Sequence, residues 1–251
     1  QWYSLKDVNE SSTETTTKLS STRHHQSDMA ACIGNNITAT GGWCLRPNHG
    51  AAMLHFRNNV SYPVPIGMRL HSRRFRQEFS KMIQIEDIHS VLDLGAGAGQ
   101  LQATMLKRFP KLDGRSFDGA GNIESYSQGA VKFADLTQPL NLEVADWVVC
   151  MDVGQHIPSR YEGMLIRNLH RHNRKGVVLS WAPIGQRGQR HVNNHSNEYI
   201  IRIMRGLGYE YDVALSLLFR EADENYEWLT KSVMVFRRPF SPEQAAISQL
   251  D

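Results

Sequence analysis

The sequence predicts an α/β fold, a doubly wound and mostly parallel sheet of seven strands with an irregular N-terminal cap. From Ser90 onward, short apolar runs typical of buried strands alternate with segments whose apolar residues recur at helical spacing. The first run, "SVLDLG", leads directly into a glycine-rich turn and then a helix. At 251 residues, the chain is long enough for one large α/β domain with an extension, or for two small domains.

The N-terminal third is predicted to lie outside the sheet. Residues 1–28 are rich in Ser, Thr and charge without an apolar period, which is typical of a disordered stalk or linker. Residues 29–89 are expected to form a cap, irregular as far as about residue 66 because Gly, Asn and Pro recur. A helix is predicted within residues 69–85, where apolar side chains have helical spacing at Leu70, Phe75, Phe79 and Met82.

The predicted α/β domain covers residues 90–240, and residues 241–251 are a C-terminal tail. Strands are expected within 90–95, 114–120, 131–139, 145–154 and 175–183. Helices are expected within 98–110, 160–172 and 196–208. Two further apolar stretches, 209–222 and 228–238, are expected to be a closing pair of strands.

Charge and hydropathy exclude two kinds of partner. The net charge of +3 is small and the basic residues are spread along the chain, so no basic face for nucleic acid is expected. No run of 18 apolar residues occurs, so no segment of this chain is expected to span a membrane. Because the chain begins at Gln1 rather than Met, we expect a processed or trimmed form, and a removed signal peptide or upstream anchor fits that expectation.

Cysteines and glycosylation sequons favour the secretory pathway. Cys150 lies in an apolar run and is expected to be a buried free thiol. Cys32 and Cys44 flank a polar, turn-rich stretch that a disulfide would staple, and the alternative is two unpaired thiols in a reducing cytosol. Sequons occur at Asn9, Asn36, Asn59 and Asn194. Three of the four lie near the predicted disulfide, so we expect an oxidising compartment.

The glycine-rich turn predicts a ligand site. Glycines let the backbone approach a ligand closely, and the following helix points its N-terminal amides at the same place. A dinucleotide pattern requires G-x-G-x-x-G, but the position three residues after Gly97 is Gln100. The turn therefore departs from the nicotinamide pattern.

Four motifs in order resemble the class I S-adenosylmethionine-dependent methyltransferases: "VLDLGAGAGQL", "FDGAGN", "FADLTQP" and "MDVGQHIP". The resemblance implies S-adenosyl-L-methionine as cofactor, with Asp118 on the ribose hydroxyls, Asp135 on the adenine amino group and Leu136 beside the ring. The residues that it assigns to the cofactor are Asp93, Gly95, Ala96, Gly97, Gly99, Gln100, Asp118, Gly119, Asp135, Leu136 and Asp152. Taken singly, Asp93 is also explained as a cap of the turn, Asp118 as a turn residue and Asp135 as the start of an Asx turn.

Polar residues after the fourth and fifth strands are candidates for binding the methyl acceptor. An alcohol acceptor needs a base, and histidine is the natural one near neutral pH, so the catalytic candidates are Asp152, His156 and His191. The candidate substrate contacts, mostly amides suited to a polyhydroxyl ligand, are Gln155, Trp181, Gln186, His191, Asn193 and Asn194. A metal site formed by convergence of Asp152, His156 and His191 is an open alternative, but these residues lack the close spacing of a zinc site, so no metal is predicted.

A finer resemblance rests on "TGGWCL", "DGAGNIE", "VGQHIP", "SWAPIGQRGQRHVNN" and "VFRR". These stretches are similar to an animal methyltransferase-like group that includes invertebrate hexose O-methyltransferases, and this implies methyl transfer to a sugar hydroxyl of glycans in the Golgi lumen. Asp152 and Gln155 stand where that group usually has glutamates, so Asp152 is the expected partner of the methionine amine. The alternatives are a methyltransferase for a small metabolite or protein side chain, and a catalytically dead binding module, against which the intact Asp93, Asp118, Asp135 and His156 argue.

Overall fold

The structure is a computed structural model that describes residues 44–56, 59–68, 71–223 and 227–239. Its main element is a seven-stranded sheet in the order β5-β4-β3-β6-β7-β9-β8. The strands are β3 (Ser90–Leu94), β4 (Asp113–Asp118), β5 (Lys132–Phe133), β6 (Ala145–Cys150), β7 (Asn173–Ser180), β8 (Glu210–Tyr211) and β9 (Val233–Arg237). The first five are parallel, and β9 runs antiparallel to its neighbours β7 and β8. The predicted doubly wound, mostly parallel sheet is confirmed.

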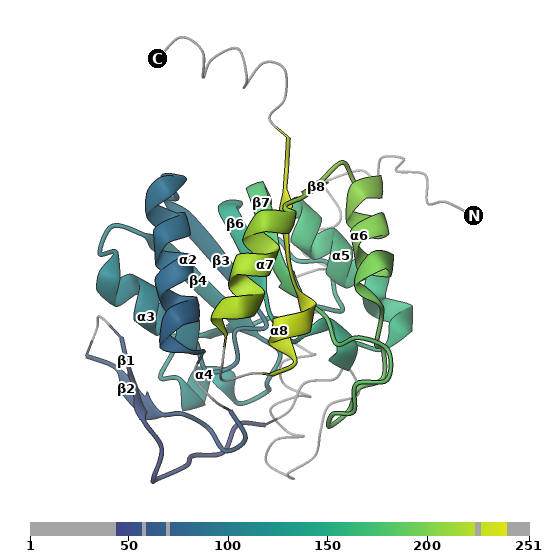
Figure 1. Ribbon diagram of the computed structural model, residues 1–251. Helices are drawn as coiled ribbons and strands as arrows, with labels where there is room; N and C mark the ends of the chain where they lie inside the picture. Colours follow the sequence, from purple (N-terminus) through teal and green to yellow (C-terminus); the bar gives the residue numbers. More distant parts are fainter. Residues whose placement is uncertain (1–43, 57–58, 69–70, 224–226, 240–251) are drawn as a thin grey trace, which may run out of the picture.

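Helices cover both faces of the sheet because its strands bury side chains on both sides (Figure 1). Val91 on β3 and Val149 on β6 face the layer of α2 (Arg73–Ile85), α3 (Gln100–Arg108) and α7 (Val213–Ala222). Leu92 and Val148 face the layer of α5 (Glu162–Arg171) and α6 (Asn197–Gly206). This alternation of side chains along one strand places a hydrophobic core on each face.

Several shorter elements complete the description. They are the hairpin of β1 (Met53–His55) and β2 (Ser61–Pro63), the helices α4 (Ile123–Tyr126) and α8 (Leu229–Ser232), and the 3-10 turns η1 (Gly154–His156) and η2 (Ser159–Tyr161). The hairpin gives regular structure to part of the cap, for which the sequence predicts an irregular conformation. In the described ranges, no helix is long and apolar enough to cross a bilayer.

One predicted element is wrong. The stretch 209–222 was expected to be a strand, but only Glu210–Tyr211 is extended and the remainder is helix α7. Asp212 caps this helix, since its side chain accepts a hydrogen bond from the Leu215 amide at 2.9 Å. Phe219 packs against Phe75 and Phe79 of α2 with ring centroids 5.4 and 6.0 Å away. Packing against α2 thus favours a helix where the apolar run alone favoured a strand. The stretch 228–238 likewise begins with α8 and is a strand only from Val233.

The predicted stalk, the first part of the cap and the C-terminal tail lie outside the described residues. Cys32 and the sequons at Asn9 and Asn36 lie there too, so the pairing of Cys32 with Cys44 stays a prediction. Cys150 is a free cysteine and fully buried, as predicted, and burial raises the pKa of its thiol.

The strand order locates a ligand site. After β3 the chain proceeds through β4 and β5 to one edge, and then returns to place β6 and β7 on the other side of β3. The strand order therefore reverses between β3 and β6. In open α/β sheets ligands bind at such a switch point, outside the carboxyl ends of the strands.

Candidate functional site

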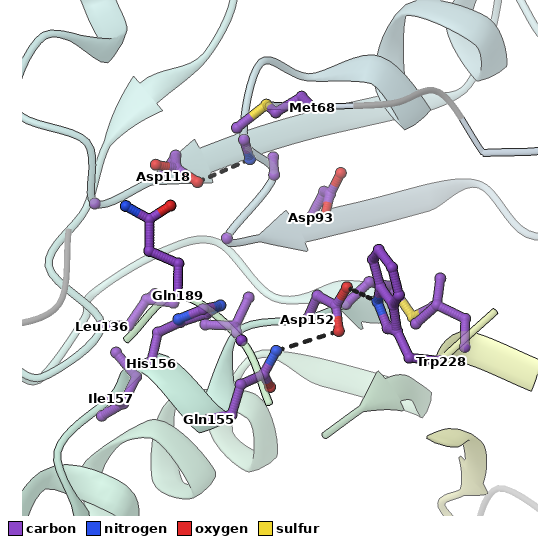
Figure 2. Close-up of a pocket in the computed structure, with 18 of the residues that line it drawn as sticks. Met68, Asp93, Asp118, Leu136, Asp152, Gln155, His156, Ile157, Gln189 and Trp228 are labelled. Atoms are coloured by element: carbon purple, nitrogen blue, oxygen red, sulfur yellow. Dashed lines mark hydrogen bonds between the residues drawn. The ribbon is translucent and has the colours of Figure 1, made fainter. Parts of the chain in front are cut away.

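A cavity of about 430 Å³ lies at this switch point. It is lined by the turns after β3, β4 and β6, by the segment after β5, by the loop after β7, and by residues from the cap and from the start of α8. Such a volume suits a ligand the size of a nucleoside or cofactor. Figure 2 shows Asp93 and Asp118 on one side of it, and Leu136 and Ile157 at the opposite end from Asp152 and Trp228.

The glycine turn after β3 has a shape that only glycine adopts readily. Gly95, Gly97 and Gly99 have φ of +81°, +54° and +71°. The amides of Gly95 and Ala96 both donate to the Phe117 carbonyl of neighbouring β4, at 2.8 and 2.9 Å. A Cβ at residue 95 would lie 2.2 Å from Cγ2 of Val153, so the loop after β6 also requires glycine here. Gly95, Ala96 and Gly97 line the cavity, whereas Gly99 begins α3 behind it.

Asp118 connects the end of β4 to the glycine turn. Its Oδ2 accepts a hydrogen bond from the Gly97 amide and its Oδ1 accepts one from the Ala120 amide, each at 2.8 Å. Each oxygen can accept a further hydrogen bond from a ligand hydroxyl, because a carboxylate oxygen has two lone pairs. Asp118 therefore shapes the turn and also lines the cavity.

The two neighbouring carboxyl groups of this wall have perturbed pKa values. Burial raises the pKa of Asp93 to about 7, and the charge of Asp118 adds to the effect. Burial also raises the pKa of Asp118 to about 6, although the Ala120 and Gly97 amides oppose the shift. A cationic or hydrogen-bond-donating ligand would favour the ionised form of both groups.

Asp135 and Leu136 line the cavity at the exit of β5. Asp135 does form an Asx turn, since its Oδ1 accepts hydrogen bonds from the Thr137 amide at 2.9 Å and the Thr137 hydroxyl at 2.6 Å. Asn168 of α5 donates to the Leu136 carbonyl at 3.1 Å. These contacts fix both residues at the cavity edge. Asp135 can therefore form the Asx turn and also contact a ligand.

Asp152 lies after β6 in a left-handed backbone conformation, with φ of +60°. Its carboxylate accepts hydrogen bonds from the Trp228 indole and, at 3.2 Å, from the Gln155 amide (Figure 2). Its own amide donates to the Ser180 hydroxyl at 2.7 Å. Burial raises the pKa of Asp152. A strained residue held by this many contacts at a cavity is typical of a functional site.

His156 and His191 both reach the cavity and form a pair, with ring centroids 5.1 Å apart. The Nδ1 of His156 donates to the Arg190 carbonyl and that of His191 to the Gln186 carbonyl, each at 3.3 Å. Burial, together with the charge of His191, lowers the pKa of His156 to about 4. His156 is therefore neutral near pH 7 and a weak base.

Three predicted substrate residues, Trp181, Asn193 and Asn194, do not line the cavity. Trp181 is fully buried, lies against Gly154 and donates to the Asn193 carbonyl at 2.6 Å. Asn193 donates to Oε2 of Glu162 at 3.0 Å. Asn194 donates to the carbonyls of Pro183 at 3.0 Å and Gln186 at 2.8 Å. These hydrogen bonds hold the loop after β7 together.

The cavity also contains residues that sequence reasoning missed. Met68 and His71 come from the cap and Trp228 comes from the segment before α8, and none belongs to a motif. Met151 and Ile157 lie within "MDVGQHIP" and Gln189 within "SWAPIGQRGQRHVNN", and this position inside the quoted motifs was a usable signal. Across the described residues, no group of three or more His, Cys, Asp or Glu side chains is arranged to hold a metal ion.

No protein-family model matches the chain, and no curated protein matches it. Solved structures are similar to it in fold. An O-methyltransferase family protein from Burkholderia thailandensis has 15% identity and a TM-score of 0.47, over 67% of this chain and 57% of that chain. Magnesium protoporphyrin IX methyltransferase from Synechocystis PCC 6803 with bound SAH has 18% identity and a TM-score of 0.47, over 65% and 82%. Human N-acetylserotonin methyltransferase in complex with SAM has 12% identity and a TM-score of 0.47, over 66% of this chain and 52% of that chain.

Proposed function

We propose that this chain is an S-adenosylmethionine-dependent O-methyltransferase that acts on a sugar hydroxyl of glycans. The single observation that carries the proposal is the wall of Asp93, Asp118 and Asp135 around a glycine turn at the switch point of the sheet. The turn gives close backbone approach, and the carboxylates give acceptors along one side of the cavity.

The charge of the cavity fits this cofactor. S-adenosylmethionine has a cationic sulfonium, an ammonium, a ribose diol and an adenine amino group, all of which suit carboxylate partners. A dinucleotide would bring its anionic pyrophosphate to the glycine turn beside Asp93, and the turn also lacks the third glycine of the dinucleotide pattern. The carboxylate wall therefore favours the sulfonium cofactor.

The family resemblance supplies a residue for each part of the cofactor, and all of these residues line the cavity. Asp118 would hold the ribose hydroxyls, and Asp135 with Leu136 would hold the adenine. Asp152 would meet the methionine amine at the far end, beside Trp228. When bound, S-adenosylmethionine supplies an electrophilic methyl group. The protein then needs only to place an acceptor in line with it and remove a proton.

The loop after β7 supports a hydroxyl-rich acceptor. Gln186, Gln189, His156 and His191 line this part of the cavity, and amide side chains both donate and accept hydrogen bonds. Such groups match the mixed donor and acceptor character of a neutral sugar. A small metabolite or a protein side chain as acceptor is the competing outcome of an acceptor screen.

We also propose that the protein resides in the lumen of the secretory pathway. The sequons and the predicted pairing of Cys32 with Cys44 support this location. Asn59 is an exposed residue between β1 and β2, and a glycan can be attached at such a surface position. Non-reducing peptide mapping of protein from a secretory host tests the location. Pairing of Cys32 with Cys44 is expected, and two free thiols would contradict it.

The cofactor is tested by calorimetric titration of S-adenosylmethionine into wild-type protein and into Asp118→Ala. Loss of a hydrogen-bonded carboxylate is expected to weaken binding by about 1.5–3 kcal/mol. Asp113→Ala is the matched control, because it lies on the same strand at the opposite end, exposed and paired with Arg115. Equal affinities for all three proteins would refute the proposal.

The acceptor is tested with labelled S-adenosylmethionine and a panel of free sugars, glycans, amines and peptides, read by mass spectrometry. Methyl groups on sugar oxygens alone are the expected result. Methylation confined to amines or peptides would overturn the glycan assignment while leaving the cofactor assignment intact.

A further inference from the structure

Met68 of the cap lies against the glycine turn at the cavity. A Cβ added at Gly97 would be 2.9 Å from Cε and 3.2 Å from Sδ of Met68, so the thioether lies directly beside this residue. Both residues line the cavity, and Met68 is half-buried. Figure 2 shows the Met68 side chain over the turn, where the Gly97 amide donates to Asp118. An apolar side chain that can pack on a ligand therefore lies beside the carboxylate proposed for the ribose hydroxyls.

The cap hairpin contacts the next two residues of the turn. The Tyr62 hydroxyl of β2 donates to the Ala98 carbonyl at 2.9 Å, and both residues are buried. The Phe56 ring lies close to Gly99, because a Cβ added there would be 3.2 Å from Cζ of Phe56. The rings of Phe56 and Tyr62 stack on each other with centroids 5.3 Å apart. The hairpin is therefore packed on the turn and on the start of α3.

Beyond Met68, the chain is anchored again at His71. The His71 amide donates to Oε1 of Gln100 at the start of α3, at 3.2 Å. Its Nδ1 lies 2.6 Å from Oδ2 of Asp223, whose side chain is fully buried at the end of α7. The position of Met68 is thus fixed by the hairpin before it in the chain and by His71 after it.

The cap is also joined to the turn after β4. The Leu45 amide donates to Oδ1 of Asn122, and the Asn122 side-chain amide donates to the Leu45 carbonyl, each at 2.8 Å. Leu45 packs in a buried cluster with Ala96 of the glycine turn and Ala120 of the turn after β4, and Met68 packs against the same cluster. The cap therefore covers both turns that Asp118 connects.

We propose that Met68 contacts the bound cofactor beside Asp118 and that the cap hairpin positions it there, an inference that rests on the proposed function. The thioether packs on the ribose side of the cofactor and excludes water from the hydrogen bonds to Asp118. Hydrogen bonds are stronger where water is excluded, so this contact slows the release of S-adenosylmethionine. Tyr62 does not line the cavity and acts through Met68, as a positioning residue.

The first test measures cofactor affinity by calorimetry and the dissociation rate by stopped flow. Met68→Ala is expected to weaken S-adenosylmethionine binding by about tenfold, equivalent to 1.4 kcal/mol, mainly through faster dissociation. Met68→Leu keeps an apolar side chain of similar volume and should stay within about threefold of wild type. Met53→Ala is the matched control, because Met53 lies on β1 of the same hairpin, 46% exposed and away from the cavity lining. Wild-type affinity in Met68→Ala, or an equal loss in Met53→Ala, would overturn the proposal.

A double-mutant cycle tests whether Tyr62 acts through Met68. Tyr62→Phe removes the hydroxyl that bonds to Ala98 and keeps the ring, and it should weaken cofactor binding by about threefold, within the range of one hydrogen bond. Adding Tyr62→Phe to Met68→Ala should weaken binding no further, because the residue that Tyr62 positions is already gone. Additive losses would show that Tyr62 acts independently and would overturn its positioning role.

Hydrogen exchange of the wild type tests the contact without any substitution. The amides of Val64 and Met68 donate to the carbonyls of Ala52 and Pro65 at 2.9 and 3.2 Å. Both should exchange more slowly once S-adenosylmethionine is bound, because a ligand that contacts the cap stabilises its ordered state. Protection confined to the glycine turn would overturn the proposal while the proposed function stands. Absence of S-adenosylmethionine binding to the wild type would instead overturn the proposed function, and the Met68 assignment with it.

Discussion

The two walls of the cavity are built by different means. The turn wall comprises residues 93–97, 118–119 and 135–136, and the loop wall comprises residues 152–157 and 186–191. The turn wall is held by the register of adjacent parallel strands and by backbone amides that donate to Asp118. The loop wall is held by separate contacts, such as the hydrogen bonds from the Val192 and Asn193 amides to the Gln155 carbonyl and the packing of Trp181 against Gly154.

This difference determines how substitutions in each wall affect ligand binding. In the turn wall, a Cβ added at Gly95 would lie 2.2 Å from Cγ2 of Val153, so one methyl group there should disrupt the wall. The loop wall depends on separate hydrogen bonds, and each of these can be weakened alone. Cofactor binding should therefore be lost abruptly by changes in the turn wall, and acceptor binding should decline gradually by changes behind the loop wall.

Gly95→Ala is expected to have the largest effect. The new Cβ would lie 2.2 Å from Val153 Cγ2, at a residue with φ of +81°. Backbone strain of about 1–3 kcal/mol adds to the clash, and the turn must move. We expect S-adenosylmethionine affinity to fall by more than about 100-fold, equivalent to nearly 3 kcal/mol, as measured by calorimetry.

The matched control for Gly95→Ala is Gly208→Ala. Gly208 has a φ of +89° but nothing within 4 Å of the added Cβ, and it follows α6 away from the cavity lining. This variant should lose stability from strain alone and bind the cofactor normally. Normal binding by Gly95→Ala would show that the turn wall tolerates movement and would remove the distinction between the two walls.

Glu162→Gln tests the loop wall and should have an intermediate effect. Oε2 of Glu162 accepts hydrogen bonds from His195 at 2.6 Å and Asn193 at 3.0 Å, and Oε1 accepts one from the Tyr199 hydroxyl at 2.6 Å. Hydrogen bonds to a charged group contribute about 1.5–3 kcal/mol each, and the neutral amide weakens them. The acceptor KM should rise by about tenfold, or 1.4 kcal/mol, with cofactor affinity unchanged.

Hydrogen exchange measures independently whether Glu162 holds the loop after β7 in place. The amides of Val192 and Asn193 donate to the Gln155 carbonyl at 2.9 and 3.1 Å, and both should exchange faster in Glu162→Gln. Glu143→Gln is the control, because that glutamate is 83% exposed and pairs only at the surface with Arg115. An equal loss of cofactor and acceptor affinity in Glu162→Gln would mean that the walls are coupled.

The same contrast explains how far the sequence predicts the site. The turn wall is contiguous in short motifs, so Asp93, Asp118 and Asp135 were identified with the correct strand ends. The loop after β7 was identified as a segment, but the direction of each polar side chain depends on tertiary contacts. Trp181 and Asn193 were expected to contact the substrate, but the Trp181 indole donates to the Asn193 carbonyl instead.

Long-range pairs give no sequence signal. His71 and Asp223 are 152 positions apart, and neither lies in a motif. Helix α7 was mistaken for a strand for a related reason. Its apolar run fits either structure until α2 is packed against Phe219. Local patterns thus predicted the sheet and the turn wall, whereas contacts between distant segments were decisive for the rest.

The smallest expected effect is the pH dependence of folding stability that Asp93 of the turn wall causes. The pKa of Asp93 is about 7 in the folded chain, well above the 3.8 of an unperturbed aspartate, mainly because of burial. The native state therefore binds more protons than the unfolded state between these values, and stability falls as pH rises through 7. Ligand-free protein should accordingly melt at a higher temperature at pH 5 than at pH 8, and Asp93→Asn should reduce that difference.

Cofactor binding should shift Asp93 from its protonated form to the ionised carboxylate. A bound cation favours the carboxylate, so S-adenosylmethionine should displace a fraction of one proton at pH 7. Calorimetry in two buffers of different ionisation enthalpy measures this release, and Asp93→Asn should abolish most of it. Asp113→Asn is the control, since its exposed side chain lies at the other end of β4. A release of equal size from Asp93→Asn and wild type would assign the proton to another group, and the turn wall would then bind the cofactor by shape and hydrogen bonding without a change of charge at Asp93.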